Sequence, residues 1–367
     1  MHLGIFMMPL HPVRPVSDTY KEDMSKIVLG DELGYSEVWL GMHYTAATEP
    51  IASPLMFMAA ALPQTKQITF ATGVLNLPCY HPGVLASEVA QFDHMCEGRF
   101  IFGIGTGALA SDFELFDNAD GAVRMGKTAE SIRMVKEIWS QDPPYELKGD
   151  YWNINVKDNI NESLGMGWML KPYQQPHPPI AISVMSPFSG TATYAGTQGW
   201  IPISANFIPT YSVASHWTKY QEGAAKAGIT PDASKWRVCR NIVVADTDAE
   251  AEEMVFGENS NLVYYYDYLW RALKAGDYTI ALKADPKMSD DDVTVEALMR
   301  DMIIFGSPET VTRKLVAFRE AVGPFGHLML AMNDWGMQRE KEENSMRLLA
   351  QEVLPRFRAA LSRNAAA

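Results

Sequence analysis

Histidines follow three of the short apolar segments in the first quarter of the chain: His11, His43 and His81. An imidazole titrates near neutral pH, so each of them could move a proton in a reaction. A histidine at the end of a strand can equally satisfy a structural hydrogen bond. For His81, which stands directly before Pro82 at the start of an expected helix, the structural interpretation is favoured.

Three histidines on successive loops could also bind a metal ion. Barrel hydrolases that use a metal usually offer a His-x-His pair after the first strand, with further His, Lys and Asp ligands later. Here the first strand is followed by His11, Pro12 and Val13, without a His-x-His pair. We therefore expect no metal site.

Two glycine-containing loops are candidates for binding a ligand. GTGALA (105–110) has the spacing of a dinucleotide fingerprint, but the polar stretch that follows it lacks helical apolar spacing. We expect Gly105 instead to let a flat ligand or the backbone approach closely. MSPFSGTA (185–192) places hydroxyls at the start of an expected helix, which suits a phosphate, although the same residues also serve as ordinary N-caps.

Methionine is frequent, with 21 residues, and several stand at the ends of the expected strands. Together with nearby aromatic residues they predict an apolar, polarizable mouth, in which a sugar-like substrate would fit poorly. An aromatic segment, 264–270, is expected to shape part of this mouth. The residues expected at the mouth are Met7, Met8, Met42, Met185, Met332, Phe6, Tyr44, Phe188 and Trp335.

Short apolar segments alternate with amphipathic helices along the whole chain. Nearly continuous apolar strands indicate a parallel sheet buried on both faces, and eight strand–helix units indicate a closed (β/α)8 TIM barrel. An open doubly wound sheet is the alternative. We expect one domain over 1–367, an external hairpin at 145–154 and a helical insertion at about 257–301 after strand seven. The expected strands are 2–8, 36–41, 68–77, 99–105, 178–184, 199–205, 236–245 and 327–332.

Composition narrows the classes of function. A formal net charge of −13, without a run rich in Lys and Arg, argues against a nucleic-acid partner. Cys79, Cys96 and Cys239 lie far apart and suggest no disulfide framework, which fits a reducing, cytoplasmic compartment. The apolar runs are too short to cross a bilayer, so we expect no membrane association.

Several segments, in this order, resemble the bacterial luciferase-like family of flavin-dependent monooxygenases over almost the whole chain. The resemblance is greatest to the limonene and diketocamphane monooxygenase branch. The segments that carry it are LGIFMMPLHP, GYSEVWLGMHYT, ITFATGVLNLPCYHP, FDHMCEGRFIFGIGTG, LKPYQQPHPPIAIS, IIFGSPETVTRKL and HLMLAM.

The resemblance implies a TIM barrel that binds reduced FMN, supplied by a separate flavin reductase. Oxygen would add to the flavin, and the resulting (hydro)peroxide would oxygenate a hydrophobic aldehyde, ketone or terpenoid. It also implies a homodimer packed through the second and third barrel helices, 53–64 and 82–95. The alternatives are a deazaflavin-dependent oxidoreductase on the same barrel and a non-catalytic flavin-binding relative.

Carried over residue by residue, the resemblance assigns His43 as the catalytic histidine. It implies a non-proline cis peptide at Gly73–Val74 under the flavin ring. Two positions depart from the family pattern: Met42 stands where an acid usually precedes the histidine, and Gly105-Thr106 replaces the Cys-Arg of luciferase. The cofactor-binding residues are then Gly73, Val74, Asn76, Gly105, Thr106, Ser186, Ser189, Gly190 and Thr191, and the substrate-binding residues are Met8, Met42, Tyr44, Met185 and Tyr265.

Overall fold

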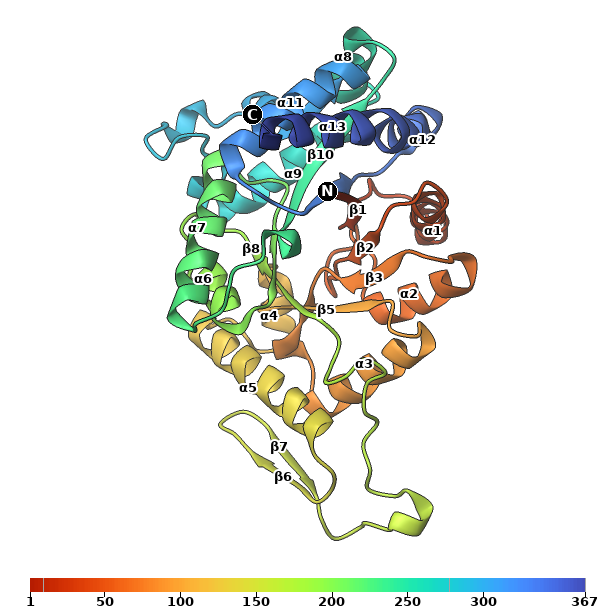
Figure 1. The fold of residues 1–367 in the computed structure, drawn as a ribbon, viewed down its shortest axis with the longest axis vertical. Helices are drawn as coiled ribbons and strands as arrows, with labels where there is room; N and C mark the ends of the chain where they lie inside the picture. Colours follow the sequence, from red (N-terminus) through yellow and green to blue (C-terminus); the bar gives the residue numbers. More distant parts are fainter. Residues whose placement is uncertain (9, 277, 367) are drawn as a thin grey trace. The chain divides into compact units, whose positions relative to one another are not determined.

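Eight parallel strands close into a barrel, so the predicted TIM-barrel class is confirmed. The structure is a computed structural model that describes residues 1–8, 10–276 and 278–366. Each of the eight predicted strands is present (Figure 1). The barrel strands are β1 (His2–Met7), β2 (Glu37–Leu40), β3 (Thr69–Thr72), β5 (Phe100–Gly105), β8 (Ile180–Val184), β9 (Ile201–Ser204), β10 (Arg237–Val244) and β12 (His327–Met332).

Burial explains why these segments are strands. All the residues of β2, β5, β9 and β10 are buried, as expected for parallel strands covered on both faces. Helices follow the strands in the alternation expected from the sequence. They are α1 (Val16–Glu32), α2 (Pro54–Ala61), α3 (Pro82–Met95), α5 (Gly121–Ser140), α6 (Gly190–Gln198), α7 (Thr210–Lys226), α8 (Asp248–Phe256), α11 (Pro308–Val322), α12 (Arg339–Leu348) and α13 (Leu354–Ala366).

The chain divides into two compact units. The terminal unit comprises Met1–Trp39 and Ala181–Ala367, and the central unit comprises Leu40–Ile180. The prediction of one domain stays a prediction. Among the described helices, none combines the length and the apolar character needed to cross a membrane.

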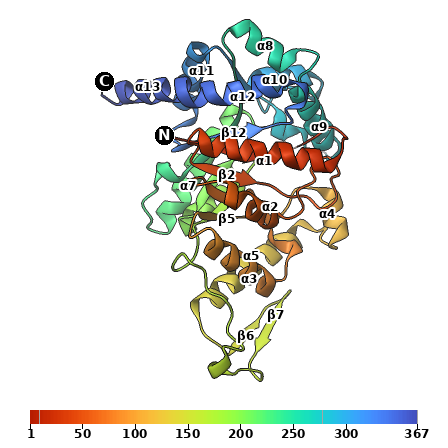
Figure 2. The same cartoon turned by 90° about the vertical axis from the view of Figure 1, so that its right-hand side faces the viewer.

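In the terminal unit, β1 pairs with β12 in register from His2 opposite His327 to Met7 opposite Met332. The first half of β10 pairs with β12, and its second half pairs with β11 (Ile303–Gly306). Helix α11 packs against both α7 and α13; Figure 2 gives a second view of this unit.

The strand β11 was not predicted. It directly follows α10 (Val295–Met302) and is only four residues long, and a short apolar run of that kind cannot be distinguished from the end of a helix by periodicity. The predicted helical insertion contains α9 (Asn261–Ala275), whose Tyr265 and Tyr266 are buried in a hydrophobic cluster.

In the central unit, β3 and the short β4 (Leu75–Asn76) both pair with β5. The Gly73–Val74 peptide between β3 and β4 is cis, as predicted. The predicted hairpin is present as β6 (Tyr145–Lys148) and β7 (Asn153–Val156). A short helix, α4 (Ala110–Leu115), lies in the polar stretch that we had interpreted as lacking helical spacing, and that interpretation was wrong.

Candidate functional site

His43 lies in the loop that follows β2 and is held from three sides. It is 8% exposed, and its backbone N–H donates to the Ile51 carbonyl at 3.2 Å. Its ring Nδ1 lies 3.0 Å from Oδ2 of Asp112, and its Nε2 lies 3.3 Å from Oε2 of Glu49. Of these three residues, the sequence singled out His43 alone, and its catalytic role stays a prediction.

Asp112, the second residue after the start of α4, gathers the loop around the histidine. Its Oδ1 accepts from the backbone N–H groups of Tyr44, at 3.1 Å, and Thr45, at 2.9 Å. The Thr45 hydroxyl donates to the same oxygen at 2.6 Å. Burial acts to raise the pKa of Asp112, but the hydrogen bonds from Thr45 and His43 outweigh it and lower this pKa below its ordinary value. Asp112 is therefore a carboxylate near neutral pH.

Asn76 and Gly105, two of the predicted cofactor-binding residues, are neighbours. They are paired in register where β4 runs beside the end of β5, and Asn76 is 5% exposed. Gly107 has a φ of +85°, and a Cβ there would lie 3.1 Å from the Phe113 ring and 3.5 Å from the Asn76 amide carbon. A side chain at this position would be strained and crowded, so the glycine keeps the turn close to Asn76. Thr106, which stands between Gly105 and Gly107 in the sequence, is half-buried.

Met42 and Tyr44 contact an aromatic neighbourhood in the central unit. The Tyr80 hydroxyl lies 3.6 Å from the Met42 sulfur, and the Tyr44 ring meets Phe116 edge-on with centroids 5.0 Å apart. Burial raises the pKa of both Tyr44 and Tyr80. Both phenols are therefore neutral at physiological pH, which suits an apolar pocket wall.

The predicted phosphate loop lies in the terminal unit, after β8. Ser189 is the N-cap of α6, and its hydroxyl accepts from the Thr191 N–H at 3.1 Å. Around Gly190, the space that a Cβ would need is open. Ser186 is held on both sides: its hydroxyl lies 2.7 Å from the Tyr278 hydroxyl, and its carbonyl lies 3.0 Å from Nε2 of His216.

His216 was not singled out from the sequence, although it orders this loop. Burial lowers its pKa to about 4, so the ring is neutral. Its Nε2–H then donates to the Ser186 carbonyl, and its Nδ1 accepts from the Ser204 hydroxyl at 2.9 Å. The loop backbone is therefore fixed by a neutral imidazole.

The remaining predicted substrate-binding residues of the terminal unit differ in burial. Met8 and Met185 are half-buried, just after β1 and β8. Tyr265 is 8% exposed, and its hydroxyl accepts from the Asn206 amide at 2.9 Å. Its ring packs edge-on against Tyr266, in the hydrophobic cluster of α9. Its role toward a substrate stays a prediction.

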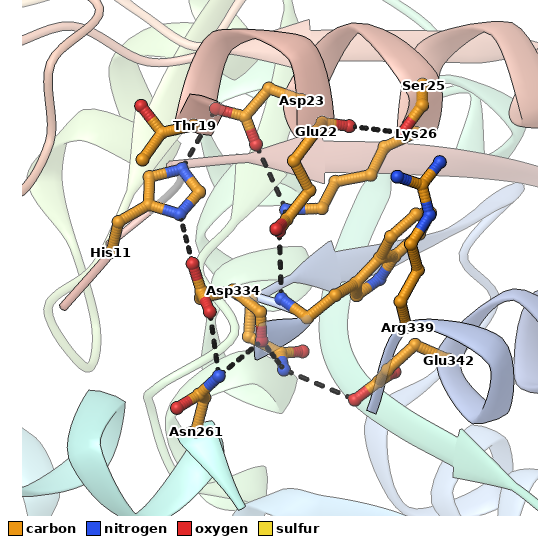
Figure 3. Close-up of polar contacts among 12 residues, drawn as sticks. His11, Thr19, Glu22, Asp23, Ser25, Lys26, Asn261, Asp334, Arg339 and Glu342 are labelled. Atoms are coloured by element: carbon orange, nitrogen blue, oxygen red, sulfur yellow. Dashed lines mark hydrogen bonds and ion pairs between the residues drawn. The ribbon is translucent and has the colours of Figure 1, made fainter. Parts of the chain in front are cut away.

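A second histidine, His11, also lies between carboxylates, in the network that Figure 3 shows. Its Nε2 is 3.0 Å from Asp23, and its Nδ1 contacts Asp334. His11, Glu22 and Asp23 lie close enough to bind a metal ion together. However, the Lys26 ammonium lies 2.7 Å from Glu22 and 3.0 Å from Asp23. A buried ammonium already pairs with both carboxylates, so the cluster is an ion-pair network.

Comparisons with known proteins show what the whole chain is similar to. The profile of the luciferase-like monooxygenase family matches residues 1–323. The 4-hydroxyprotoasukamycin monooxygenase of Streptomyces nodosus subsp. asukaensis is 30% identical, over 98% of this chain and 92% of the relative. The limonene 1,2-monooxygenase of Rhodococcus erythropolis is 27% identical, over 96% of this chain and 86% of the relative.

A solved structure extends the similarity to three dimensions. It is the oxygenating constituent of 3,6-diketocamphane monooxygenase from Pseudomonas putida, a type II Baeyer–Villiger monooxygenase in complex with FMN. The two structures superpose with a TM-score of 0.87 at 28% identity, covering 97% of this chain and 98% of the other. The chain therefore belongs to the luciferase-like monooxygenase family, and it is a monooxygenase.

Proposed function

We propose that the chain is the oxygenase component of a two-component, FMN-dependent monooxygenase. Reduced FMN would come from a separate flavin reductase, and the substrate would be a hydrophobic aldehyde, ketone or terpenoid. The observation that carries the proposal is the buried imidazole of His43, held at Nδ1 by the Asp112 carboxylate in the loop after a barrel strand. The relative bound to FMN supports the choice of cofactor.

We propose a role toward FMN for residues of each unit, taken separately. We propose that the Gly73–Val74 backbone, Asn76, Gly105 and Thr106 of the central unit bind the flavin ring. In the terminal unit, the capped start of α6 has the partial positive charge and hydroxyls that a phosphate requires. We propose that Ser186, Ser189, Gly190 and Thr191 bind the phosphate through hydroxyl and backbone N–H groups.

Bound and reduced, FMN would supply the electrons that activate O2. The chain's own residues would then control protons and water. We propose that His43 exchanges a proton at Nε2 and that Asn76 donates a hydrogen bond from its amide. The apolar side chains Met8, Met42, Tyr44, Met185 and Tyr265 would bind the substrate and exclude water, which strengthens the electrostatic interactions in the site.

The test is rapid mixing of the protein, loaded with reduced FMN, with O2 and a bicyclic ketone. The expected result is an oxygen-dependent absorbance transient and a product that carries one atom from labelled O2. In His43→Ala, FMN binding should persist while product formation falls by about 10²–10⁴-fold, because proton transfer by a positioned side chain contributes on that order. If the protein turned over substrate with a reduced deazaflavin under nitrogen but not with reduced FMN and O2, the reaction would instead be a hydride transfer. A protein that binds FMN and never turns over would be a binding relative.

We also propose that the chain forms a homodimer through α2 and α3. Both helices expose large apolar side chains: Met56 is 75% exposed, Val84 51% and Met95 48%. Exposed apolar area of this kind is typical of interfaces between proteins. Light scattering should give about twice the chain mass, and the double variant Met56→Lys, Val84→Lys should give the monomer. A wild-type monomer at micromolar concentration would contradict this part.

A further inference from the structure

The Asp112 carboxylate makes two kinds of contact, and only one of them touches a reactive group. Through Oδ1 it accepts from Tyr44 and Thr45, which ties α4 to the loop after β2. Through Oδ2 it contacts Nδ1 of His43. Asp112 is 2% exposed, so water competes little for either oxygen.

Chemistry fixes the direction of the contact with His43. A carboxylate can only accept hydrogen bonds, so Nδ1 must carry the hydrogen that it donates to Asp112. The opposite ring nitrogen, Nε2, then differs from Nδ1 in both surroundings and role. It lies 3.3 Å from Oε2 of Glu49, and because this carboxylate also can only accept, the contact is favourable only while Nε2 carries a hydrogen.

We infer that Asp112 is a positioning residue that holds His43 through Nδ1–H, so that Nε2 is the nitrogen that exchanges a proton during the reaction, with Glu49 as the partner of Nε2 between reactions. The acid that usually precedes the histidine in this family is Met42 here, and a residue 69 positions away in sequence supplies a carboxylate instead. The expected effect on turnover rests on the proposed function, whereas the position of the proton on the His43 ring does not.

The substitution Asp112→Asn separates the two kinds of contact. The amide oxygen of asparagine can still accept from the N–H groups of Tyr44 and Thr45, so α4 stays tied to the loop. Its amide NH2 then faces Nδ1 and can only donate, which forces the proton of His43 to Nε2. In catalytic triads, the equivalent change in tautomer lowers kcat by about 10⁴-fold with the geometry intact.

The primary readout is the ring nitrogen signals of ¹⁵N-histidine-labelled protein without FMN, with His43→Gln identifying the signals of His43. In the wild type, we expect a proton on Nδ1, and in Asp112→Asn we expect a proton on Nε2 and none on Nδ1. Glu49→Gln and Thr45→Val leave Asp112 in place, so both should keep the Nδ1 proton. Unchanged His43 signals in Asp112→Asn would overturn the inference, as would a wild type with its proton on Nε2 alone.

The secondary readouts are turnover and FMN affinity. Asp112→Asn should lower kcat by roughly 10²–10⁴-fold, with the dissociation constant for FMN changed less than about threefold. The matched control is Glu114→Gln, an exposed residue on the same helix, which should keep full activity. A merely structural role predicts the same loss in Thr45→Val as in Asp112→Asn, and that result would overturn the inference. If the wild type oxygenates no substrate with FMN and O2, the proposed function fails, while the ring signals still decide the role of Asp112.

Discussion

His11 and His43 each follow a strand of the barrel, and each contacts two carboxylates. His11 lies between Asp23 and Asp334 and is 1% exposed. His43 lies between Asp112 and Glu49 and is 8% exposed. By residue type and by distance to their carboxylates, the two arrangements are alike. Their other neighbours differ, and these determine what each histidine can do.

The carboxylates around His11 have further cationic partners. Arg14 contacts Glu22 and Asp334, and Lys26 contacts Glu22 and Asp23. The partners of Asp112, apart from His43, are neutral hydroxyl and N–H groups. Charges that are balanced within a buried network mainly specify structure, because moving a proton there leaves another ion unpaired.

This difference in neighbours supports our proposal that His11 belongs to the architecture and His43 to the chemistry. A histidine between two carboxylates does not identify a catalytic site until the charges around those carboxylates have been counted.

The largest expected change in stability comes from removing the Lys26 ammonium, the buried cation of the ion-pair network around His11. Lys26 is fully buried, and although burial acts to lower its pKa, Asp23 and Glu22 outweigh that and raise it. Lys26→Met leaves both carboxylates buried without their ammonium, and we expect the free energy of unfolding at pH 7 to fall by about 3–5 kcal/mol. Urea denaturation measures this.

The matched control is Lys21→Met, on the same helix, where the side chain is 77% exposed and paired with Asp18. Its unfolding midpoint should stay within experimental error of the wild type. Equal stability of Lys26→Met and the wild type would mean that the network does not hold the fold, and the contrast with His43 would lose its basis.

The second largest expected change in stability concerns Glu342, whose side chain lies at the edge of the same network. Burial raises the pKa of Glu342 to about 7, with only partial compensation from the Asn333 amide. The folded protein then binds a proton that the unfolded chain has released, so stability falls as the pH rises from about 4.5 to about 7. Glu342→Gln keeps the shape of the neutral acid, and it should stabilise the fold at pH 8 by up to about 3 kcal/mol.

At pH 4, Glu342 is protonated in the folded and the unfolded chain, so the variant should match the wild type. Urea midpoints at pH 4 and pH 8 make the comparison. A constant difference at both values would show that ionisation of Glu342 is not the cause.

The barrel could be predicted from the sequence because it depends on local pattern. Each barrel strand is a short apolar run bounded by turn residues, and these runs alternate with helices. This pattern can be recognised without knowing which residues contact one another in the fold. The strand β11 and the helix α4 were missed because each is too short to show a period. The cis peptide at Gly73–Val74 came from the family resemblance, since nothing in the local spacing requires it.

The two carboxylate pairs could not be predicted because they depend on the fold. Asp112 is 69 residues from His43, and Asp334 is 323 residues from His11. By local pattern alone, His11 and His43 are equivalent, as imidazoles that follow apolar strands, and only the family resemblance singled out His43. Only the tertiary structure assigns one to an ion-pair network that also contains Lys26.

The smallest expected effect tests the two histidines directly. Burial acts to lower the pKa of His11, but the hydrogen bonds to Asp23 and Asp334 outweigh it and raise it. A raised pKa in the folded state gives stability that is fully present below about pH 6.5 and is lost as the pH rises through the folded pKa. In a Glu342→Gln background, which removes that titration, His11→Gln should therefore lower the free energy of unfolding more at pH 6 than at pH 9.

The companion variant is His43→Gln, in which the glutamine amide can still donate to Asp112. We expect it to lower the free energy of unfolding by less than about 1 kcal/mol while removing most oxygenation activity. Folded His11→Gln, in contrast, should keep its turnover per molecule. Urea denaturation at both pH values and assays of the folded fraction measure the two effects. If His11→Gln lost turnover while folded and His43→Gln kept it, the roles would be reversed, since a network balanced in charge would then be the one that moves the proton.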